Sequence, residues 1–210
     1  MVEHYNPGPP TTPRQAATVI LLSGGDTALE VLLVRRNPQA RFMGGVWVFP
    51  GGSLDGQRET GRDAHRVAAA RELREEAAIT LGDHRELVEF SRWITPEQVS
   101  VRFDTRFFLA PLPAGQRPSV DGQECVELGW FTPRGALDAH GRGEIELVFP
   151  TIKHLEQLSG FPSATAVLER ARAREREVRP VQPRVVVVDG GAGGEVRVLL
   201  PGEPGYDAGP

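Results

Sequence analysis

The segment Asp63–Ile79 most constrains the fold of this chain, because it is rich in Ala, Arg and Glu and contains no Gly or Pro. This composition predicts a helix. Apolar segments that predict strands precede it at Ala16–Leu22, Glu30–Arg36 and Val46–Phe49, and follow it at Leu87–Ile94, Arg102–Ala110 and Val126–Phe131. The turn residues 23–26 join the first two strands into a hairpin, and Pro50-Gly51-Gly52 ends the third strand.

The last third of the sequence predicts three further helices and a terminal hairpin. The helices are expected at Pro133–His140, Thr151–Leu158 and Ser163–Arg176, and the hairpin strands at Arg184–Val188 and Val196–Leu200, around Gly190-Gly191. Strands interleaved with a few helices indicate an α/β or α+β sandwich.

Three parts of the chain are distinguished. Residues 1–15 carry four prolines and are expected to form an extended arm. Residues 16–140 form the core, and residues 141–210 form a C-terminal helical and hairpin extension packed on it. Two roles stay open for this last part, which are covering the pocket and mediating a homodimer.

The composition is that of an ordinary soluble globular protein, with 40% hydrophobic and 25% charged residues. A net charge of −4 gives no reason to expect a nucleic-acid polymer as partner. No apolar run approaches the roughly 20 residues of a membrane span. Cys125 excludes an intrachain disulfide, because it has no second cysteine to pair with, and is interpreted as a small core residue. A cytoplasmic protein is expected.

Residues 71–76 read RELREE and bring three carboxylates to one side of the predicted helix. Each residue advances by about 100°, so Glu72, Glu75 and Glu76 fall within one sector. Crowded carboxylates repel one another unless a cation neutralises them, and Mg²⁺ or Mn²⁺ prefers such hard oxygen ligands. The apolar residues on the roughly opposite side, which are expected to pack on a sheet, are Val67, Ala70, Leu73 and Ala77.

The alternative for this helix is a solvated acidic face that Arg71 and Arg74 balance. The residues before the helix favour the metal site. Gly51-Gly52 follows a strand and leaves the backbone free for close approach to a ligand. A loop then leads into the acidic helix, so that a backbone carbonyl can join the carboxylates.

Gly52, an acid and then RELREE together resemble the Nudix box, G-x5-E-x7-R-E-U-x-E-E-x-G-U. The resemblance implies a Nudix fold, a mixed β-sheet sandwiched between helices. It also implies that Glu72, Glu75, Glu76 and the Gly52 carbonyl bind divalent metal ions. In the same family pattern, Arg71 pairs with the first acid of the box and braces the loop.

The chain departs from the box in three places. Ten residues rather than five separate Gly52 from Asp63, the residue that stands at the first acidic position. Glu59 is the alternative partner for Arg71. Ala78 replaces the box glycine, near the end of the helix. No metal carboxylate is lost.

Residues 32–52 are similar to a narrower signature, that of the Nudix coenzyme A diphosphatases, L-L-T-x-R-[SA]-x3-R-x3-G-x3-F-P-G-G. Val34 and Asn37 depart from it. Residues 93–96 (WITP) and 102–108 (RFDTRFF) look like the peroxisomal or mitochondrial type of this group.

Arginines and aromatic residues of the same segment are candidate substrate contacts. Arg36 and Arg41 suit phosphate, because guanidinium presents paired donors to phosphate oxygens. Phe42, Met43 and Trp47 are candidates for contact with an adenine or acyl group, or are core residues, the second being favoured for Trp47.

Glu124 is the candidate for an additional metal ligand or base from a later loop, in competition with Glu127. The predicted reaction is Mg²⁺- or Mn²⁺-dependent attack of water on a nucleotide diphosphate, with CoA or acyl-CoA favoured as the small-molecule substrate. ADP-ribose, NADH and dinucleoside polyphosphates are the alternative substrates. A nucleotide-sensing Nudix module without turnover is the alternative of another class.

Overall fold

One large mixed sheet organises the computed structural model, which describes residues 6, 8–188 and 195–207. Its strands are β1 (Arg14–Ser23), β2 (Glu30–Arg36), β3 (Trp47–Val48), β4 (Gly51–Ser53), β5 (Val88–Ile94), β6 (Phe103–Pro111), β7 (Cys125–Phe131) and β8 (Pro180–Val181). The strand order is β3-β2-β1-β6-β5-β8, with β4 paired to β1 and β7 paired to β2. The expected hairpin of β1 and β2 is confirmed, with Leu22 opposite Val31. Strand β6 runs parallel to β1, and β8 runs parallel to β5, so the sheet is mixed as expected.

The segment after the third predicted strand differs from expectation. The sequence predicts that Pro50-Gly51-Gly52 ends that strand, but Gly51–Ser53 forms a further strand, β4, which pairs with Ala16–Thr18 of β1. A side chain at Gly51 would meet this neighbour, because a Cβ atom there would lie 2.4 Å from Thr18 Oγ1 and 2.6 Å from the Ala17 carbonyl oxygen. The glycine therefore permits β4 to pair closely with β1.

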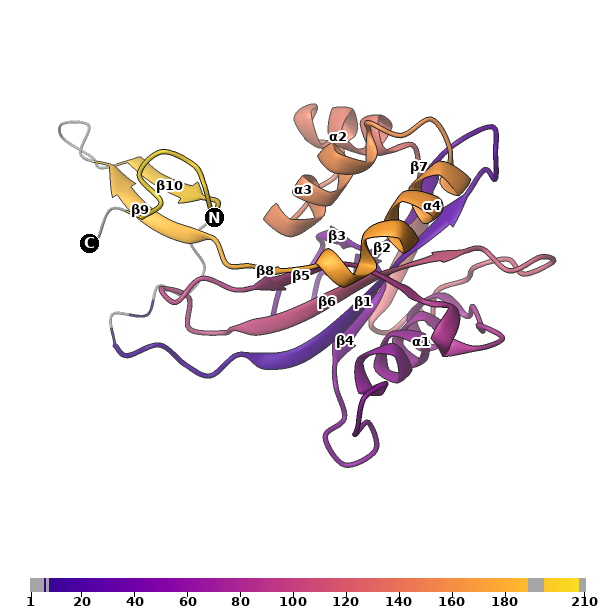
Figure 1. Cartoon of the computed structure of the whole chain (residues 1–210), viewed down its shortest axis with the longest axis horizontal. Coiled ribbons are helices and arrows are strands. Elements are labelled where there is room, and N and C mark those ends of the chain that lie inside the picture. The colour runs from indigo at the N-terminus through magenta and orange to yellow at the C-terminus, as the bar shows by residue number, and fades with distance from the viewer. Residues whose placement is uncertain (1–5, 7, 189–194, 208–210) are drawn as a thin grey trace.

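Helices cover both faces of the sheet. They are α1 (Ala64–Ala77), α2 (Pro133–Gly141), α3 (Phe149–Leu158) and α4 (Ala164–Arg174), with short 3₁₀ turns at His84–Glu86 and Glu175–Glu177. In Figure 1, α1 lies below the sheet, while α2, α3 and α4 lie above it. No helix of the described residues is long and apolar enough to cross a membrane.

The strands in the middle of the sheet are buried on both faces, which explains their uninterrupted apolar sequences. In β1, Val19 and Leu21 belong to the cluster under α1, whereas Ile20 and Leu22 belong to the cluster under α3 and α4. Each of these four side chains is at most 1% exposed. The two faces of the sheet are thus two separate halves of one hydrophobic core.

The C-terminal residues contribute to this core and then form a second sheet. Leu155 and Leu158 of α3 are fully buried against the large sheet. Strands β9 (Arg184–Val188) and β10 (Glu195–Leu199) pair antiparallel, as predicted, at the end of the molecule away from α1 (Figure 1). Tyr206 Oη donates a hydrogen bond to the Gln182 carbonyl oxygen at 2.7 Å. The predicted turn residues Gly190-Gly191 lie outside the described residues.

His154 is the one histidine of the described chain that is completely enclosed, at 1% exposure. Its Nε2 lies 2.6 Å from Ser91 Oγ, and rings of Phe49, Phe90, Trp93 and Phe107 surround it. Burial lowers the pKa of His154 to about 4, because the charged ring would lose its hydration, although the Pro150 carbonyl partly favours the proton.

This histidine is expected to make folding sensitive to acid. The unfolded ring binds a proton below about pH 6.5, while the folded ring stays neutral down to about pH 4, so its contribution to stability falls as the pH falls through this window. We expect wild type to lose about 3 kcal/mol more unfolding free energy between pH 7 and pH 4 than His154→Gln does. Urea unfolding at the two pH values measures the difference, and His84→Gln, at a partly exposed ring, is the control. Equal losses in wild type and His154→Gln would contradict the expectation.

Candidate functional site

Helix α1 presents two of its three predicted carboxylates to the sheet rather than to solvent. Glu72 and Glu76 are 8% and 2% exposed, whereas the Glu75 side chain is about half exposed. Leu73 and Ala77 pack in the core as expected. The prediction that Val67 lies on the same buried side is wrong, because this residue is 37% exposed.

The buried face of α1 is built from small side chains, and this brings the helix close to the sheet. Ala68, Ala69 and Ala77 are fully buried against the strands. A Cβ atom at Gly52 would lie 2.4 Å from Glu72 Oε1, so any larger residue there would displace the carboxylate from its present position. The Gly51 N–H donates a 2.9 Å hydrogen bond to Glu76 Oε2. The two glycines therefore let the carboxylates of α1 pack directly on the backbone of β4.

Burial makes the negative charge of these two carboxylates costly. It raises the pKa of Glu76 to about 7, against the opposing effect of the Gly51 hydrogen bond. Burial also raises the pKa of Glu72, where hydrogen bonding to Arg71 opposes the change and repulsion from Glu75 and Glu124 adds to it. The repulsion from Glu124 indicates that this later residue faces the same side of α1. A cation at this place would stabilise several carboxylates at once.

Arg71 lies at the centre of the acidic residues. Its Nη1 donates to Glu72 Oε1 at 2.8 Å and to Glu75 Oε2 at 2.9 Å. Its Nε donates to Glu59 Oε1 at 2.7 Å, and its Nη2 donates to the Ser53 carbonyl at 3.1 Å. These contacts raise the pKa of the guanidinium above its already high value, the bond to Glu59 being the largest cause. Arg71 therefore braces the loop between β4 and α1.

The acid that pairs with Arg71 is Glu59, not Asp63, which occupies the first acidic position by sequence. Asp63 is the N-cap residue of α1, and its side chain makes no capping hydrogen bond. Glu59 is 6% exposed, and its second oxygen accepts a 2.7 Å hydrogen bond from the Asp55 N–H. The longer loop places this partner four residues earlier in the chain than the box spacing predicts.

Ala78, which stands where the box has glycine, is the C-cap of α1. Its φ of 54° lies in the left-handed region, and its N–H donates to the Arg74 carbonyl. Glycine adopts this conformation without the steric cost that a Cβ brings. The departure therefore affects the end of the helix and not the acidic face.

The donors at this site suit a hard divalent cation, although they are not gathered as a ready cluster. Across the described ranges 6, 8–188 and 195–207, no three His, Cys, Asp or Glu side chains form a group that could hold a metal ion. Arg71 explains this, since its guanidinium lies between Glu72 and Glu75. Buried carboxylates beside the Gly51–Gly52 backbone are the oxygen donors that Mg²⁺ and Mn²⁺ prefer. An ion that bound all three carboxylates would compete with Arg71 for two of them.

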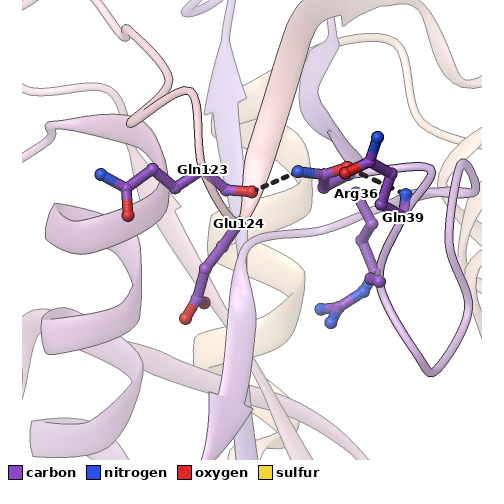
Figure 2. Close-up of a pocket in the computed structure, with 6 residues that line it drawn as sticks. Arg36, Gln39, Gln123 and Glu124 are labelled. Carbon is purple, nitrogen blue, oxygen red and sulfur yellow. Dashed lines mark hydrogen bonds between the residues drawn. The ribbon is translucent and has the colours of Figure 1, made fainter.

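A pocket of about 440 Å³, a volume in the range of small-molecule sites, lies where β2 ends and β7 begins. Two of its residues, Arg36 and Glu124, interact electrostatically with Glu76 and Glu72 of α1. The residues that line it are Arg36, Asn37, Gln39, Ala40, Gln123 and Glu124. Figure 2 shows the head groups of Arg36 and Glu124 pointing the same way from opposite walls. Arg36 Nε is buried and has no hydrogen-bond partner within the described part of the chain. The pocket thus combines a cationic side chain with a carboxylate.

Glu124 and Glu127, the two competing acids of the later segment, have different surroundings. Glu124 lines the pocket, whereas Glu127 pairs with Arg35 at 3.3 Å on the exposed surface of the sheet. Cys125, between them, is fully buried, as the core interpretation expects. Burial raises the pKa of its thiol beyond the physiological range.

The other predicted contacts lie apart from the pocket lining. Trp47 is 6% exposed and packs edge-on against Phe131, 5.5 Å between ring centroids, which supports the core interpretation and leaves no surface for a ligand. Phe42 is partly buried and packs against Phe103. Arg41 is exposed on the loop before β3.

Sequence reasoning missed the polar residues that shape the pocket. Gln39 and Gln123 belong to no sequence motif, and Asn37 stands out in the sequence only as a departure from a signature. The signal that could have found Asn37 is its position, directly after Arg36 at the end of a predicted strand.

Comparisons with known proteins agree with this geometry. The sequence profile of the NUDIX domain matches residues 12–149, more than half of the chain. The crystal structure of a NUDIX hydrolase from Alicyclobacillus acidocaldarius is similar with a TM-score of 0.67 and 28% sequence identity, covering 76% of this chain and 96% of that one. This likeness extends to the mixed sheet and the helices on its faces.

Two relatives in sequence cover smaller shares. Putative nudix hydrolase 7 of Caenorhabditis elegans is 28% identical over 182 residues, which are 70% of this chain and 60% of that protein. Acyl-coenzyme A diphosphatase NUDT19 of Xenopus laevis is 35% identical over 79 residues, which are 36% of this chain and 21% of that protein. The chain thus spans less than two thirds of the length of either relative. With the domain match, the fold and the acidic helix beside two glycines, the chain belongs to the Nudix family.

Proposed function

We propose that this chain is a Mg²⁺- or Mn²⁺-dependent hydrolase that cleaves a diphosphate joining a nucleoside to another moiety. The observation that carries the proposal is the packing of Glu72 and Glu76 against Gly51 and Gly52, near a pocket that Arg36 and Glu124 line. Burying two carboxylates with one nearby arginine costs stability unless a cation is bound. A polyanionic substrate would itself require such a cation.

Glu72, Glu75, Glu76 and the Gly52 carbonyl would hold the metal. When bound, the ion lowers the pKa of water and neutralises diphosphate oxygens. Glu124, or a carboxylate of α1, accepts the proton of the attacking water. The water oxygen bonds to phosphorus, the bond from phosphorus to the bridging oxygen breaks, and the departing group leaves as a monophosphate.

The arginines have separate roles in this proposal. Arg36 lines the pocket, and its guanidinium donates to a phosphate oxygen and stabilises charge that spreads over the phosphoryl group. Arg41, exposed on the adjoining loop, contacts a more distant phosphate, and Phe42 on the same loop contacts the adenine or acyl end. Arg71 holds the loop of Glu59 and does not touch the substrate.

Coenzyme A or acyl-CoA is the substrate we favour, with 3′,5′-ADP and 4′-phosphopantetheine or its acyl form as products. Support comes from the signature-like residues 32–52 and from the short match to a protein named as an acyl-coenzyme A diphosphatase. Asn37, which departs from that signature, lines the pocket and keeps ADP-ribose, NADH and dinucleoside polyphosphates as alternatives.

A substrate panel tests the proposal. Purified protein with Mg²⁺ or Mn²⁺ is incubated with CoA, acyl-CoA, ADP-ribose, NADH and diadenosine polyphosphates, and products are resolved by anion-exchange chromatography. We expect kcat/KM for CoA or acyl-CoA at least about 10-fold above the others, a difference of about 1.4 kcal/mol in transition-state binding. A higher value for another compound would reassign the substrate. Nucleotide binding without turnover on the whole panel would indicate the sensing module instead.

The proposal also covers the domain organisation of the chain, its partner and its cellular compartment. Residues 16–140 would carry the reaction, preceded by the arm 1–15 and followed by the extension 141–210, which would cover the pocket or join two copies. A small nucleotide is the proposed partner, without a nucleic-acid polymer or a membrane. The single cysteine supports a cytoplasmic setting.

A further inference from the structure

Glu124 lies on an exposed loop, and this raises the question of what fixes its position. The loop joins the turn at Gly122 to the start of β7 at Cys125. The residue is exposed, and no hydrogen bond of its carboxylate is found among the described residues. An acid on a mobile loop would spend little time at the distance that proton transfer or metal binding requires. Its backbone must therefore be held by other groups.

Asp121 holds one side of this backbone. Its Oδ2 accepts a hydrogen bond from the Glu124 N–H at 3.0 Å, and its Oδ1 accepts one from the Cys125 N–H at 2.9 Å. The Gly122 N–H closes the turn on the Cys125 carbonyl at 3.0 Å. These contacts are local, so they shape the loop without linking it to the rest of the pocket.

Asn37 links the loop to the opposite wall. Its side-chain Nδ2 donates to the Gln123 carbonyl at 2.8 Å, and its backbone N–H donates to the Glu124 carbonyl at 2.8 Å. Its Oδ1 accepts a 2.9 Å hydrogen bond from the Gln39 N–H. The residue thus uses both halves of its amide, one to hold the Glu124 loop and the other to hold its own loop.

Asn37 directly follows Arg36, the last residue of β2. The sheet therefore fixes the positions of both Arg36 and Asn37. Asn37 in turn holds the Gln123–Glu124 loop on the other side of the pocket. Serine or alanine, the residues of the coenzyme A signature at this position, cannot form both side-chain bonds at once, because alanine has no polar group and a serine hydroxyl is too short to span them.

We infer that Asn37 is a positioning residue, which sets Glu124 opposite Arg36 across the pocket. This inference rests on the proposed function, in which Glu124 acts on the attacking water or on the metal. Asn37 itself touches neither, and it acts through the Gln123–Glu124 backbone.

A double-mutant cycle with Glu124 tests the inference. We expect Asn37→Ala to lower kcat about 10-fold and Glu124→Gln about 10²-fold. If Asn37 acts through Glu124, Asn37→Ala in the Glu124→Gln background lowers kcat by less than about 2-fold, because the group that it positions is already absent. A full 10-fold loss in that background would overturn the inference. Asn37→Ser is the second variant, expected to match Asn37→Ala, should the alanine protein fold poorly.

The matched control is Gln116→Ala, which removes another side-chain amide that is hydrogen-bonded to the backbone. Gln116 Nε2 donates to the Thr80 carbonyl at 2.7 Å, and its Oε1 accepts from the Thr80 N–H at 2.8 Å. Each alanine variant loses a side-chain amide that is hydrogen-bonded to the backbone of a partly exposed loop, but only Asn37→Ala is expected to lower kcat. Equal losses of kcat in the two variants would show a general effect of stability and overturn the inference.

Hydrogen exchange gives a readout that does not depend on turnover. We expect the amides of Glu124 and Cys125 to exchange faster in Asn37→Ala than in wild type or Gln116→Ala. Unchanged exchange there would overturn the inference even if the enzyme were active. Conversely, if wild type hydrolysed no compound of the substrate panel, the proposed function would fail, while the exchange result would still test whether Asn37 holds the Glu124 loop.

Discussion

Replacing Glu76 by glutamine is expected to lower kcat by at least about 10²-fold while the fold survives, and Glu75→Gln is expected to do the same. Glutamine has the shape of glutamate, and its carbonyl oxygen can still accept the hydrogen bond that Gly51 N–H donates to Glu76. Glu75 is half exposed, so its replacement disturbs no packing. Only the negative charge at the proposed metal site is removed. Steady-state kinetics with saturating substrate and Mg²⁺ measures the effect.

A thermal shift separates metal binding from turnover in this experiment. A ligand that binds only the folded state raises its stability, so Mg²⁺ or Mn²⁺ should raise the Tm of wild type and raise that of Glu76→Gln much less. Glu156→Gln, on the exposed face of α3, is the control for loss of a carboxylate elsewhere. Near-normal turnover in both Glu75→Gln and Glu76→Gln would show that the ligand assignment is wrong.

Arg71→Met is expected to lower the unfolding free energy by about 3 kcal/mol, the largest stability effect of any single change at the site. The Glu59 side chain is 3% exposed, and without the guanidinium only the Asp55 N–H hydrogen bond remains to compensate its buried charge. Methionine retains most of the aliphatic stem of arginine, so the change removes mainly the charge and its hydrogen bonds. Urea unfolding monitored by circular dichroism measures the loss.

The double variant Glu59→Gln/Arg71→Met is the test of this cause. With the buried acid neutralised, most of the lost stability should return, because no unpaired charge remains between the loop and α1. Activity should not return, since the loop is no longer braced by an ion pair. A double variant as unstable as Arg71→Met would mean that Glu59 is not the reason for the loss.

The sequence by itself determined the four helices, the strands other than β4 and β8, and the nature of the acidic face. The apolar runs 19–22 and 31–34 mark the buried parts of β1 and β2, because strand segments buried on both faces need consecutive apolar residues. The Ala-rich segment before RELREE predicts a helix, and the spacing of three glutamates places them in one sector of it. These properties depend only on local composition and on helical geometry. They can therefore be read from residues that are close together in the sequence.

The partners of those residues were decided by the tertiary structure. Periodicity assigned Val67 to the sheet, but the alanines of α1 turn a different face inward, so that Glu72 and Glu76 are buried and Val67 is not. Spacing assigned Asp63 to Arg71, but the longer loop brings Glu59 to it instead. The conformation of a loop depends on where its ends are anchored and on the tertiary contacts that it makes. Neither can be read from the sequence of the loop itself.

Long-range pairing decided the rest of the pocket. Sequence named Glu124 as the candidate ahead of Glu127, three residues away, but it could not give the surroundings of either, because these depend on how β7 pairs with β2. That register directs Glu127 to Arg35 on the sheet surface and leaves Glu124 beside Arg36. The chemistry of each residue type was thus visible in the sequence. Its position was not, because contacts between segments some 90 residues apart along the chain exist only once the sheet has formed.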